Sequence, residues 1–194
     1  GKSTLLDIIA GFAQPDHGQV LWGGAALTGL APGARPISLL FQDGNLFPHL
    51  TAFQNVALGL RPSLRLSAEE AAQVRLGLSR VGLDGFADRK PGALSGGQQS
   101  RVALARMLLR AEPLVLLDEP FAALGPALKS EMLALLQELV TETSATLLMV
   151  THDPDDAVKL GDQTILVAEG VAHPPQATEA LFADPPPALA AYLG

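Results

Sequence analysis

Short apolar runs alternate along the chain with longer stretches in which apolar residues recur every three or four positions. The short runs are rich in leucine and β-branched residues, as buried strands are, and the longer stretches are typical of amphipathic helices. Because parallel strands are joined by helical crossovers, the alternation predicts an α/β fold with a mostly parallel sheet. Strands are expected over residues 18–22, 37–41, 114–117, 146–150 and 164–167.

Helical patterns fill the intervals between these runs. A first helix is expected over residues 4–10. Ser67 followed by Glu70 is typical of a capping box and predicts a helix that continues to about Val81. A third helix is expected over residues 127–140, where apolar positions at helical spacing predict a face buried in the core. These positions are Leu128, Met132, Leu135, Leu136 and Leu139.

The same patterns predict the domain organisation. A chain of 194 residues with 48% hydrophobic content can bury one sizeable core, which predicts a single domain over residues 1–194. The segment from about 50 to 91 has several helical patterns and no convincing strand, so we expect a helical subdomain inserted in the core. The proline-rich tail, from about 174 to 194, is expected to be loop or linker.

Composition narrows the classes of partner. The formal net charge of −7 argues against a nucleic acid, which binds best to a basic face. The absence of cysteine excludes disulfides and thiolate metal sites and fits a reducing cytosol. No apolar run approaches the roughly 18 residues of a membrane span, so we expect any membrane association to come through a partner.

The first four residues, Gly1, Lys2, Ser3 and Thr4, match the end of the phosphate-binding P-loop, G-x-x-x-x-G-K-[ST]. The beginning of that loop and the strands before it are expected to precede Gly1. In a P-loop, backbone amides surround the phosphates, the lysine neutralises their oxygens and the next hydroxyl binds Mg²⁺. Lys2 and Ser3 fit these roles. The alternative for these residues alone is a solvated lysine at a chain end.

Polar residues follow three of the predicted strands. Gln42 follows the second, Asp118 and Glu119 follow the third, and His152 follows the fourth. Ligands of open α/β folds bind at the carboxyl ends of the strands, so Asp118 and Glu119 are expected to lie where a ligand binds. The alternatives are a surface glutamine, an acidic pair that caps a helix and a structural histidine.

Residues 94–98 read Leu-Ser-Gly-Gly-Gln, which is the most specific motif of the chain. Taken alone, it could be only a flexible helix start. In this order with the other motifs, it resembles the ATP-binding subunits of ABC transporters, and the resemblance extends from Gly1 to about Leu181. The resemblance implies a P-loop NTPase core of the ABC ATPase type, ATP hydrolysis, and ATP with Mg²⁺ as cofactors.

The resemblance also implies a role for each motif residue. Glu119 would polarise the attacking water, and His152 would contact the γ-phosphate and position Glu119. Magnesium would be held by Ser3, Gln42 and Asp118. The residues implied to contact nucleotide are Gly1, Lys2, Ser3, Thr4, Gln42, Ser95, Gly96, Gly97 and Gln98.

Partners follow from the same resemblance. In such subunits the motif at 94–98 closes over the ATP held by a second copy, which implies a homodimer. Ser95 would donate its hydroxyl, Gly96 and Gly97 would let backbone amides approach the phosphate, and the helix from Gln98 would add its dipole. A membrane permease is implied as partner, with a periplasmic or extracellular binding protein as an indirect one. The subunit would lie peripherally on the cytoplasmic face of the plasma or inner membrane.

Three short segments of the sequence indicate which solute is transported. Segments 41–51, 54–60 and 64–66 resemble those of thiamine importers, and importers of iron, sulfate and polyamines share much of the pattern. Two other classes are soluble ABC ATPases of DNA repair or chromosome structure, and a non-catalytic interaction module. The short separation of Gln42 from Ser95 leaves no space for the coiled coil of the chromosome proteins.

Two residues depart from the family pattern, and one of them is Ser100, which stands where the family often has a larger Arg or Gln. Gly125 stands where the family usually has the aspartate of the D-loop, which crosses the dimer. Because glycine offers no side-chain acceptor, we expect weaker coupling between the two sites of a dimer.

Overall fold

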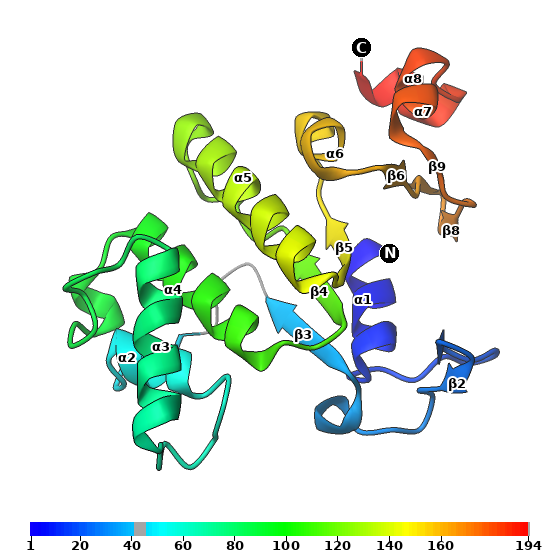
Figure 1. Cartoon of the computed structure of the whole chain (residues 1–194). Coiled ribbons are helices and arrows are strands. Elements are labelled where there is room, and N and C mark those ends of the chain that lie inside the picture. The colour runs from blue at the N-terminus through cyan, green and yellow to red at the C-terminus, as the bar shows by residue number, and fades with distance from the viewer. Residues whose placement is uncertain (41–45, 194) are drawn as a thin grey trace.

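A three-stranded parallel sheet lies at the centre of the fold (Figure 1). Its strands are β3 (Ile37–Leu40), β4 (Leu114–Asp118) and β5 (Thr146–Val150), in the order β3-β4-β5. The structure is a computed structural model, and it describes residues 1–40 and 46–193. Helices pack on this sheet, so the predicted α/β fold class is confirmed.

Helices make up much of the remaining described chain. Two are of the 3-10 type, η1 (Pro32–Ala34) and η2 (Pro91–Ala93). The three helices predicted from the sequence are present as α1, α3 and α5, with ends that differ from the expected ones by no more than three residues. The α-helices are α1 (Lys2–Ala10), α2 (Ala52–Ala57), α3 (Ala68–Arg80), α4 (Gly96–Arg110), α5 (Pro126–Thr143), α6 (Pro154–Leu160), α7 (Thr178–Ala183) and α8 (Pro187–Leu193).

The central strand β4 separates two apolar layers. Leu114 and Leu116 are buried against α1 on one face of the sheet. Val115 and Leu117 are buried on the other face, in a cluster that includes side chains of α4 and α5. Because successive side chains of a strand point to opposite faces, a strand covered on both faces must be apolar throughout. This explains why the run 114–117 was recognisable in the sequence.

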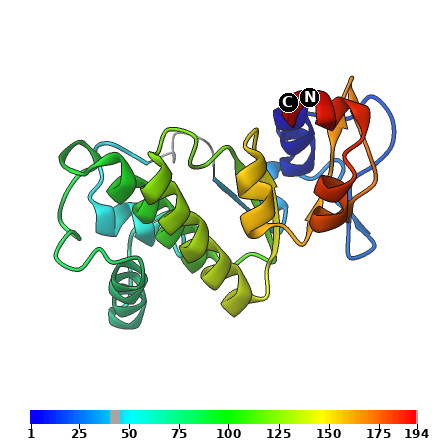
Figure 2. The ribbon, with the colours of Figure 1, turned by 90° about the horizontal axis from the view of Figure 1, so that it is seen from above.

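The chain between β3 and β4 forms a helical region. Helices α2, α3 and α4 pack around a common apolar cluster, which includes Val56, Val74 and Val102. Figures 1 and 2 both show α2 and α3 at one end of the molecule and α1 with the C-terminal elements at the other. Capping boxes begin all three helices, and the one at Ser67 and Glu70 was predicted.

Two predicted strands are shorter than expected. In the run 18–22 only Leu21 and Trp22 form a strand, β1, which pairs with β2 (Ala25–Ala26). The run 164–167 is divided between β6 (Gln163–Thr164) and β7 (Val167–Ala168). Each pairs antiparallel with a different later strand, so one continuous strand cannot form. These later strands are β9 (Gln176–Ala177) and β8 (Val171–Ala172).

The expectation that residues 174–194 are loop or linker was wrong. The described part of this tail contains β9 and the helices α7 and α8. Leu181 of α7 and Leu189 of α8 are buried. Pro187 occupies the first position of α8. Proline has no backbone N–H, but at this position an N–H would have no partner within the helix. Burial of leucine side chains, together with proline at a helix start, explains the helical tail.

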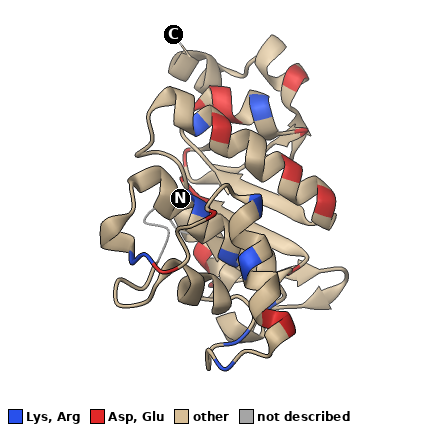
Figure 3. Cartoon of the chain, turned by 60° about the vertical axis from the view of Figure 1, so that its left-hand side comes forward, with Lys and Arg blue, Asp and Glu red and all other residues tan. Residues whose placement is uncertain are grey.

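Charged residues are concentrated on helices and loops (Figure 3). The three strands of the central sheet contain no lysine or arginine, and Asp118 is their one acidic residue. Acidic and basic positions are interspersed in this view rather than gathered by sign. Among the described residues, no helix is both long enough and apolar enough to cross a membrane.

Candidate active site

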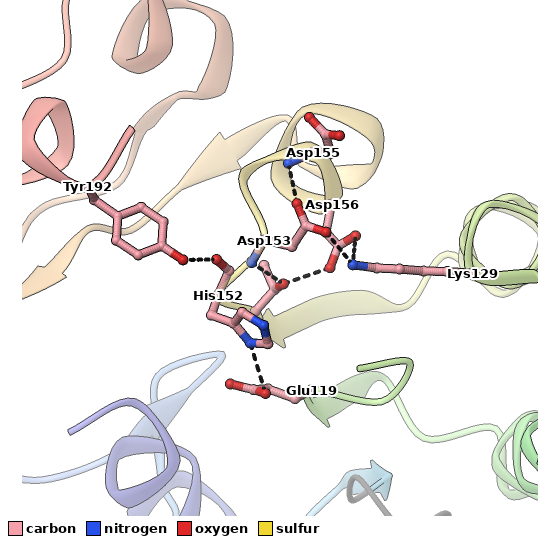
Figure 4. Close-up of polar contacts among 8 residues, drawn as sticks. Glu119, Lys129, His152, Asp153, Asp155, Asp156 and Tyr192 are labelled. Carbon is pink, nitrogen blue, oxygen red and sulfur yellow. Dashed lines mark hydrogen bonds and ion pairs between the residues drawn. The ribbon is translucent and has the colours of Figure 1, made fainter. Parts of the chain in front are cut away.

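Glu119 and His152 are in contact at the carboxyl edge of the sheet (Figure 4). Glu119 directly follows β4, and His152 comes two residues after the end of β5. Asp118 pairs with Val150 across these neighbouring strands, which brings the residues after each strand side by side. His152 Nδ1 lies 2.9 Å from Glu119 Oε2, within hydrogen-bonding distance. The two residues expected to be catalytic are thus brought together.

Glu119 has a backbone conformation that residues with side chains rarely adopt. Its φ angle is +46°, in the left-handed region. Its N–H donates to the Val150 carbonyl at 3.0 Å, and its own carbonyl accepts from the Ala122 N–H at 3.2 Å. Such a conformation costs on the order of 1–3 kcal/mol and persists where the surrounding structure imposes it. Here it accompanies a sharp turn after β4, with the carboxylate directed toward His152 (Figure 4).

Four polar residues hold the loop that carries His152, and we refer to Lys129, Thr151, Asp153 and Asp156 as the Lys129 cluster. Lys129 Nζ lies 2.6 Å from Asp153 Oδ2 and 2.7 Å from Asp156 Oδ1. Thr151 Oγ1 donates to Asp156 Oδ2 at 2.6 Å and accepts from the Asp153 N–H at 3.0 Å. The cluster therefore binds the chain on both sides of His152.

The charges of the cluster influence one another. Burial lowers the pKa of Lys129, but hydrogen bonds from its ammonium to Asp153 and Asp156 outweigh this effect, and the net pKa is raised. The hydrogen bond from Lys129 holds the pKa of Asp153 below its ordinary value, and the N–H of Asp155 acts in the same direction. The charged forms of Lys129 and Asp153 are thus both stabilised.

A cavity of about 220 Å³ opens beside Glu119 and His152. The turn 120–126 forms one wall, and the end of β5 with the loop after it forms another. Lys129 also lines the cavity, whereas neither Lys2 nor the residues 95–98 do so. The cavity is therefore bounded by the two segments that carry the expected catalytic residues.

The C-terminal helix also reaches this loop. Tyr192 of α8 donates a hydrogen bond from its hydroxyl to the His152 carbonyl at 2.5 Å (Figure 4). The backbone of His152 is thereby connected to a part of the chain that was expected to be loop.

Asp118 provides a buried carboxylate oxygen at the same edge. Its Oδ1 atom is inaccessible to solvent and accepts no hydrogen bond from the described residues. An unsatisfied buried acceptor costs about 1–3 kcal/mol, so this atom fits a ligand that brings a positive charge or a donor. The described residues contain no group of three acidic or histidine side chains that could hold a metal by themselves.

The P-loop-like residues form the start of α1. Gly1 is the N-cap, and Lys2, Ser3 and Thr4 occupy the first turn. The N–H groups of a first turn have no partner within the helix and attract anions, an effect that the helix dipole strengthens. In Figure 1 this end of α1 lies on the same side of the sheet as the end of β5. The arrangement can hold phosphate near the carboxyl edge.

The motif at 94–98 begins helix α4. Ser95 is the N-cap, and its hydroxyl accepts from the Gln98 N–H at 3.3 Å. The Gln98 side chain in turn accepts from the Ser95 N–H at 2.9 Å. Ser95 and Gly96 are exposed and Gly97 is buried. Within this chain the motif is thus a helix cap on the surface, outside the cavity beside Glu119.

Gln42, the remaining predicted site residue, lies outside the described residues. Sequence reasoning missed Lys129, which lies within the helix expected over residues 127–140. It also missed Asp156, although an acidic residue in the first turn after a histidine loop could have indicated a capping interaction. The sequence contains no sign that these two residues meet, because they belong to different helices.

Comparisons with known proteins show which family this chain is similar to. A family model described as ABC transporter matches residues 1–122. The "Thiamine import ATP-binding protein ThiQ" of Cereibacter sphaeroides is 64% identical over all of this chain and 84% of its own length. The protein of the same name from a Ruegeria species is 60% identical, again over all of this chain and 84% of its own length.

Solved structures agree. One is a dimeric ATP-binding cassette in a post-hydrolysis state with ADP and Pi; it is 34% identical, with a TM-score of 0.79 over 92% of this chain and 81% of that one. Another is cbiO1 from Clostridium perfringens, part of an ABC transporter complex, which is 30% identical, with a TM-score of 0.83 over 95% and 75% of the two chains.

The fold and these similarities define an ATP-binding P-loop ATPase. The chain belongs to the ABC transporter family. The resemblance drawn from the motifs is therefore confirmed.

Proposed function

We propose that this chain is the ATP-hydrolysing subunit of an ABC importer and that it energises the uptake of thiamine. The contact between Glu119 and His152 at 2.9 Å carries the catalytic part of this proposal. The names of relatives that are 64% and 60% identical over the whole chain support the solute.

Glu119 is the proposed general base. One carboxylate oxygen accepts from His152, which leaves the other free to take a proton from the attacking water. His152 uses Nδ1 for Glu119, and Nε2, when it also carries a proton, can donate to an oxygen of the γ-phosphate. In this arrangement the histidine orients the base and the phosphate relative to each other. Most of the catalytic effect in phosphoryl transfer comes from such positioning and from charge stabilisation.

The remaining motif residues bind the nucleotide and its metal. Lys2 and the first-turn amides of Gly1–Thr4 hold phosphate, and Ser3, Gln42 and Asp118 hold Mg²⁺. The buried, unsatisfied Oδ1 of Asp118 supports this assignment. When bound, Mg²⁺ supplies positive charge that neutralises the phosphate oxygens.

The motif at 94–98 serves a second copy of the chain. Ser95, Gly96, Gly97 and Gln98 lie outside the cavity beside Glu119, which supports a role toward the nucleotide of a partner in a homodimer. A related cassette solved as a dimer adds support. We further propose that the dimer docks on a membrane permease at the cytoplasmic face, through a domain whose helical subdomain spans about 50–91. A solute-binding protein would act from the other side.

Reconstituted transport tests the proposal. The full-length protein, its permease and the solute-binding protein are placed in proteoliposomes, and uptake of labelled thiamine is followed with and without ATP. Uptake should require ATP and should be lost in Glu119→Gln. Uptake of iron, sulfate or a polyamine in place of thiamine would overturn the assigned solute. Absence of ATP hydrolysis by the intact complex would overturn the enzymatic assignment.

A further inference from the structure

Lys129 connects the two segments that carry Glu119 and His152. Its backbone N–H donates to the Gly125 carbonyl at 2.9 Å, at the end of the turn that begins with Glu119. Its side chain extends from α5 to Asp153 and Asp156, on the far side of the cavity (Figure 4). The backbone bond is the first intrahelical bond of α5, so it is the side chain of Lys129 that links this helix, which begins where the turn after Glu119 ends, to the acidic residues that follow His152.

The contact of Lys129 with Asp156 is more enclosed than that of a surface ion pair. The side chain of Lys129 is 17% exposed and that of Asp156 is 8% exposed. A pair in such surroundings is screened little, and removing one partner leaves the other charge uncompensated. Without the ammonium, Asp153 and Asp156 would face each other as like charges. The loop between Thr151 and Asp156 would then have to separate them.

We infer that Lys129 is a positioning residue that holds the His152 loop in register with the turn after Glu119. The inference rests on the proposed function, in which Glu119 and His152 act together in ATP hydrolysis. Lys129 acts through His152, by holding Asp153 and Asp156, and takes no part in the reaction itself. Displacing a reacting group by about 1 Å can lower a rate about a hundredfold, so a moderate shift of this loop should be measurable.

Three variants of the full-length protein test the inference by steady-state ATP hydrolysis. Lys129→Met keeps the length of the side chain and removes its charge, and Lys129→Arg keeps the charge. Lys159→Met is the matched control, because Lys159 is an exposed lysine on α6 and makes no ion pair with the described residues. We expect Lys129→Met to lower kcat about tenfold with KM for ATP within twofold. Lys129→Arg should recover at least half of the wild-type kcat, and Lys159→Met should leave it unchanged.

A double-mutant comparison separates positioning from general stabilisation. In a His152→Ala background, Lys129→Met should lower kcat by less than twofold further, because the residue through which it acts is absent. A full tenfold loss in that background would overturn the inference. So would a Lys129→Met protein that keeps its wild-type kcat, or one in which KM rises and kcat does not fall.

The histidine ring signals give a readout without hydrolysis. The chain has four histidines, His17, His49, His152 and His173. In NMR spectra, Lys129→Met should move the ring signals of His152 and leave the other three in place. Unmoved His152 signals would overturn the inference even if hydrolysis were impaired. If instead His152→Ala left hydrolysis intact, the role proposed for His152 in hydrolysis would fail, and the His152 signals would still decide on positioning.

Folding is controlled separately. The melting temperature and ATP-binding stoichiometry of each variant define its folded fraction. The kcat value is then calculated per folded molecule. If Lys129→Met did not fold, Lys129→Gln, which keeps a polar tip without charge, would take its place with the same expected results.

Discussion

Gly97 of α4 lies directly against Leu128 of α5. A Cβ atom at position 97 would stand 2.5 Å from Leu128 Cδ2, whereas a Cβ atom at Gly96 would meet nothing within 4 Å. The two adjacent glycines are therefore required for different physical reasons. Gly97 permits close packing of two helices, and Gly96 leaves an exposed stretch of backbone open to a partner.

This difference predicts opposite effects of two small substitutions. Gly97→Ala should lower the free energy of unfolding by about 1–3 kcal/mol, because Leu128 or the helices must shift. Gly96→Ala should keep or slightly raise the stability, since alanine favours a helix over glycine. Urea denaturation measures both. Equal effects of the two substitutions would contradict the packing role of Gly97. Because Gly96→Ala should keep its stability, a loss of ATP-dependent dimerisation in this variant would indicate a lost contact with the partner and not unfolding.

The proposed base predicts the behaviour of Glu119→Gln. The amide keeps the shape of the side chain but cannot accept a proton, so the full-length protein should bind ATP and hydrolyse it very slowly. We expect a loss of well over tenfold, where tenfold equals about 1.4 kcal/mol of barrier. The variant should accumulate as an ATP-bound dimer in size-exclusion chromatography. Hydrolysis above a tenth of the wild-type rate would exclude Glu119 as the base.

The lowered pKa of Asp153 predicts a dependence of stability on acid. A carboxyl whose pKa is lower in the folded state contributes stability above its unfolded pKa, and this contribution is lost as the pH falls through the folded pKa. The ordinary value is 3.8, so unfolding free energies should begin to fall from about pH 5 downward. Asp153→Asn should show a smaller fall over this range. Asp16→Asn, which changes an exposed aspartate outside the cluster, should behave as wild type.

An aspartate side chain would fit at position 125. Gly125 is the N-cap of α5 with a φ of −66°, no side-chain cap is present, and a Cβ atom there would meet nothing within 4 Å. Gly125→Asp should raise stability by a few tenths of a kcal/mol through capping. In the full-length dimer it should also strengthen ATP-dependent association, by about 1 kcal/mol if one hydrogen bond is gained. Gly125→Ala, which cannot cap, is the control, and unchanged dimer affinity in the aspartate variant would show that the turn works without its acidic residue.

Phe47 offers a test of permease docking. The residue is 46% exposed, while its backbone is held by Asn55, which accepts from the Phe47 N–H at 2.8 Å and donates to the Phe47 carbonyl at 3.1 Å. Phe47→Ala should therefore keep the melting temperature and reduce co-purification of the permease. The neighbouring Leu46 packs into the core, so Leu46→Ala should lower the melting temperature. A lowered melting temperature in Phe47→Ala would instead assign the ring to the core.

Local signals account for what could be read directly from the chain. The capping box of Ser67 and Glu70 acts within four residues, and the run 114–117 is apolar because both of its faces are covered. Motifs such as 94–98 were recognisable because their chemistry requires particular residues at adjacent positions. These features depend on neighbours in sequence, so α3, β4 and the family were predictable.

The short C-terminal elements depend on distant contacts instead. Helices α7 and α8 form where Leu181 and Leu189 find apolar surroundings, and the prolines around them favoured a loop when only local preferences were considered. The division of the run 164–167 likewise follows from pairing with two different later strands. Burial and strand pairing are settled by the whole chain, which is why these predictions failed.

The sequence by itself determined the fold class and that Glu119 and His152 each follow a strand. Only the tertiary structure decided that they meet at 2.9 Å and that Lys129 holds the loop between Thr151 and Asp156. The first contact requires the parallel register of β4 with β5, and the second requires α5 to lie against the start of α6. Register and helix packing join residues that are remote in the chain, and no periodicity along one segment contains that information.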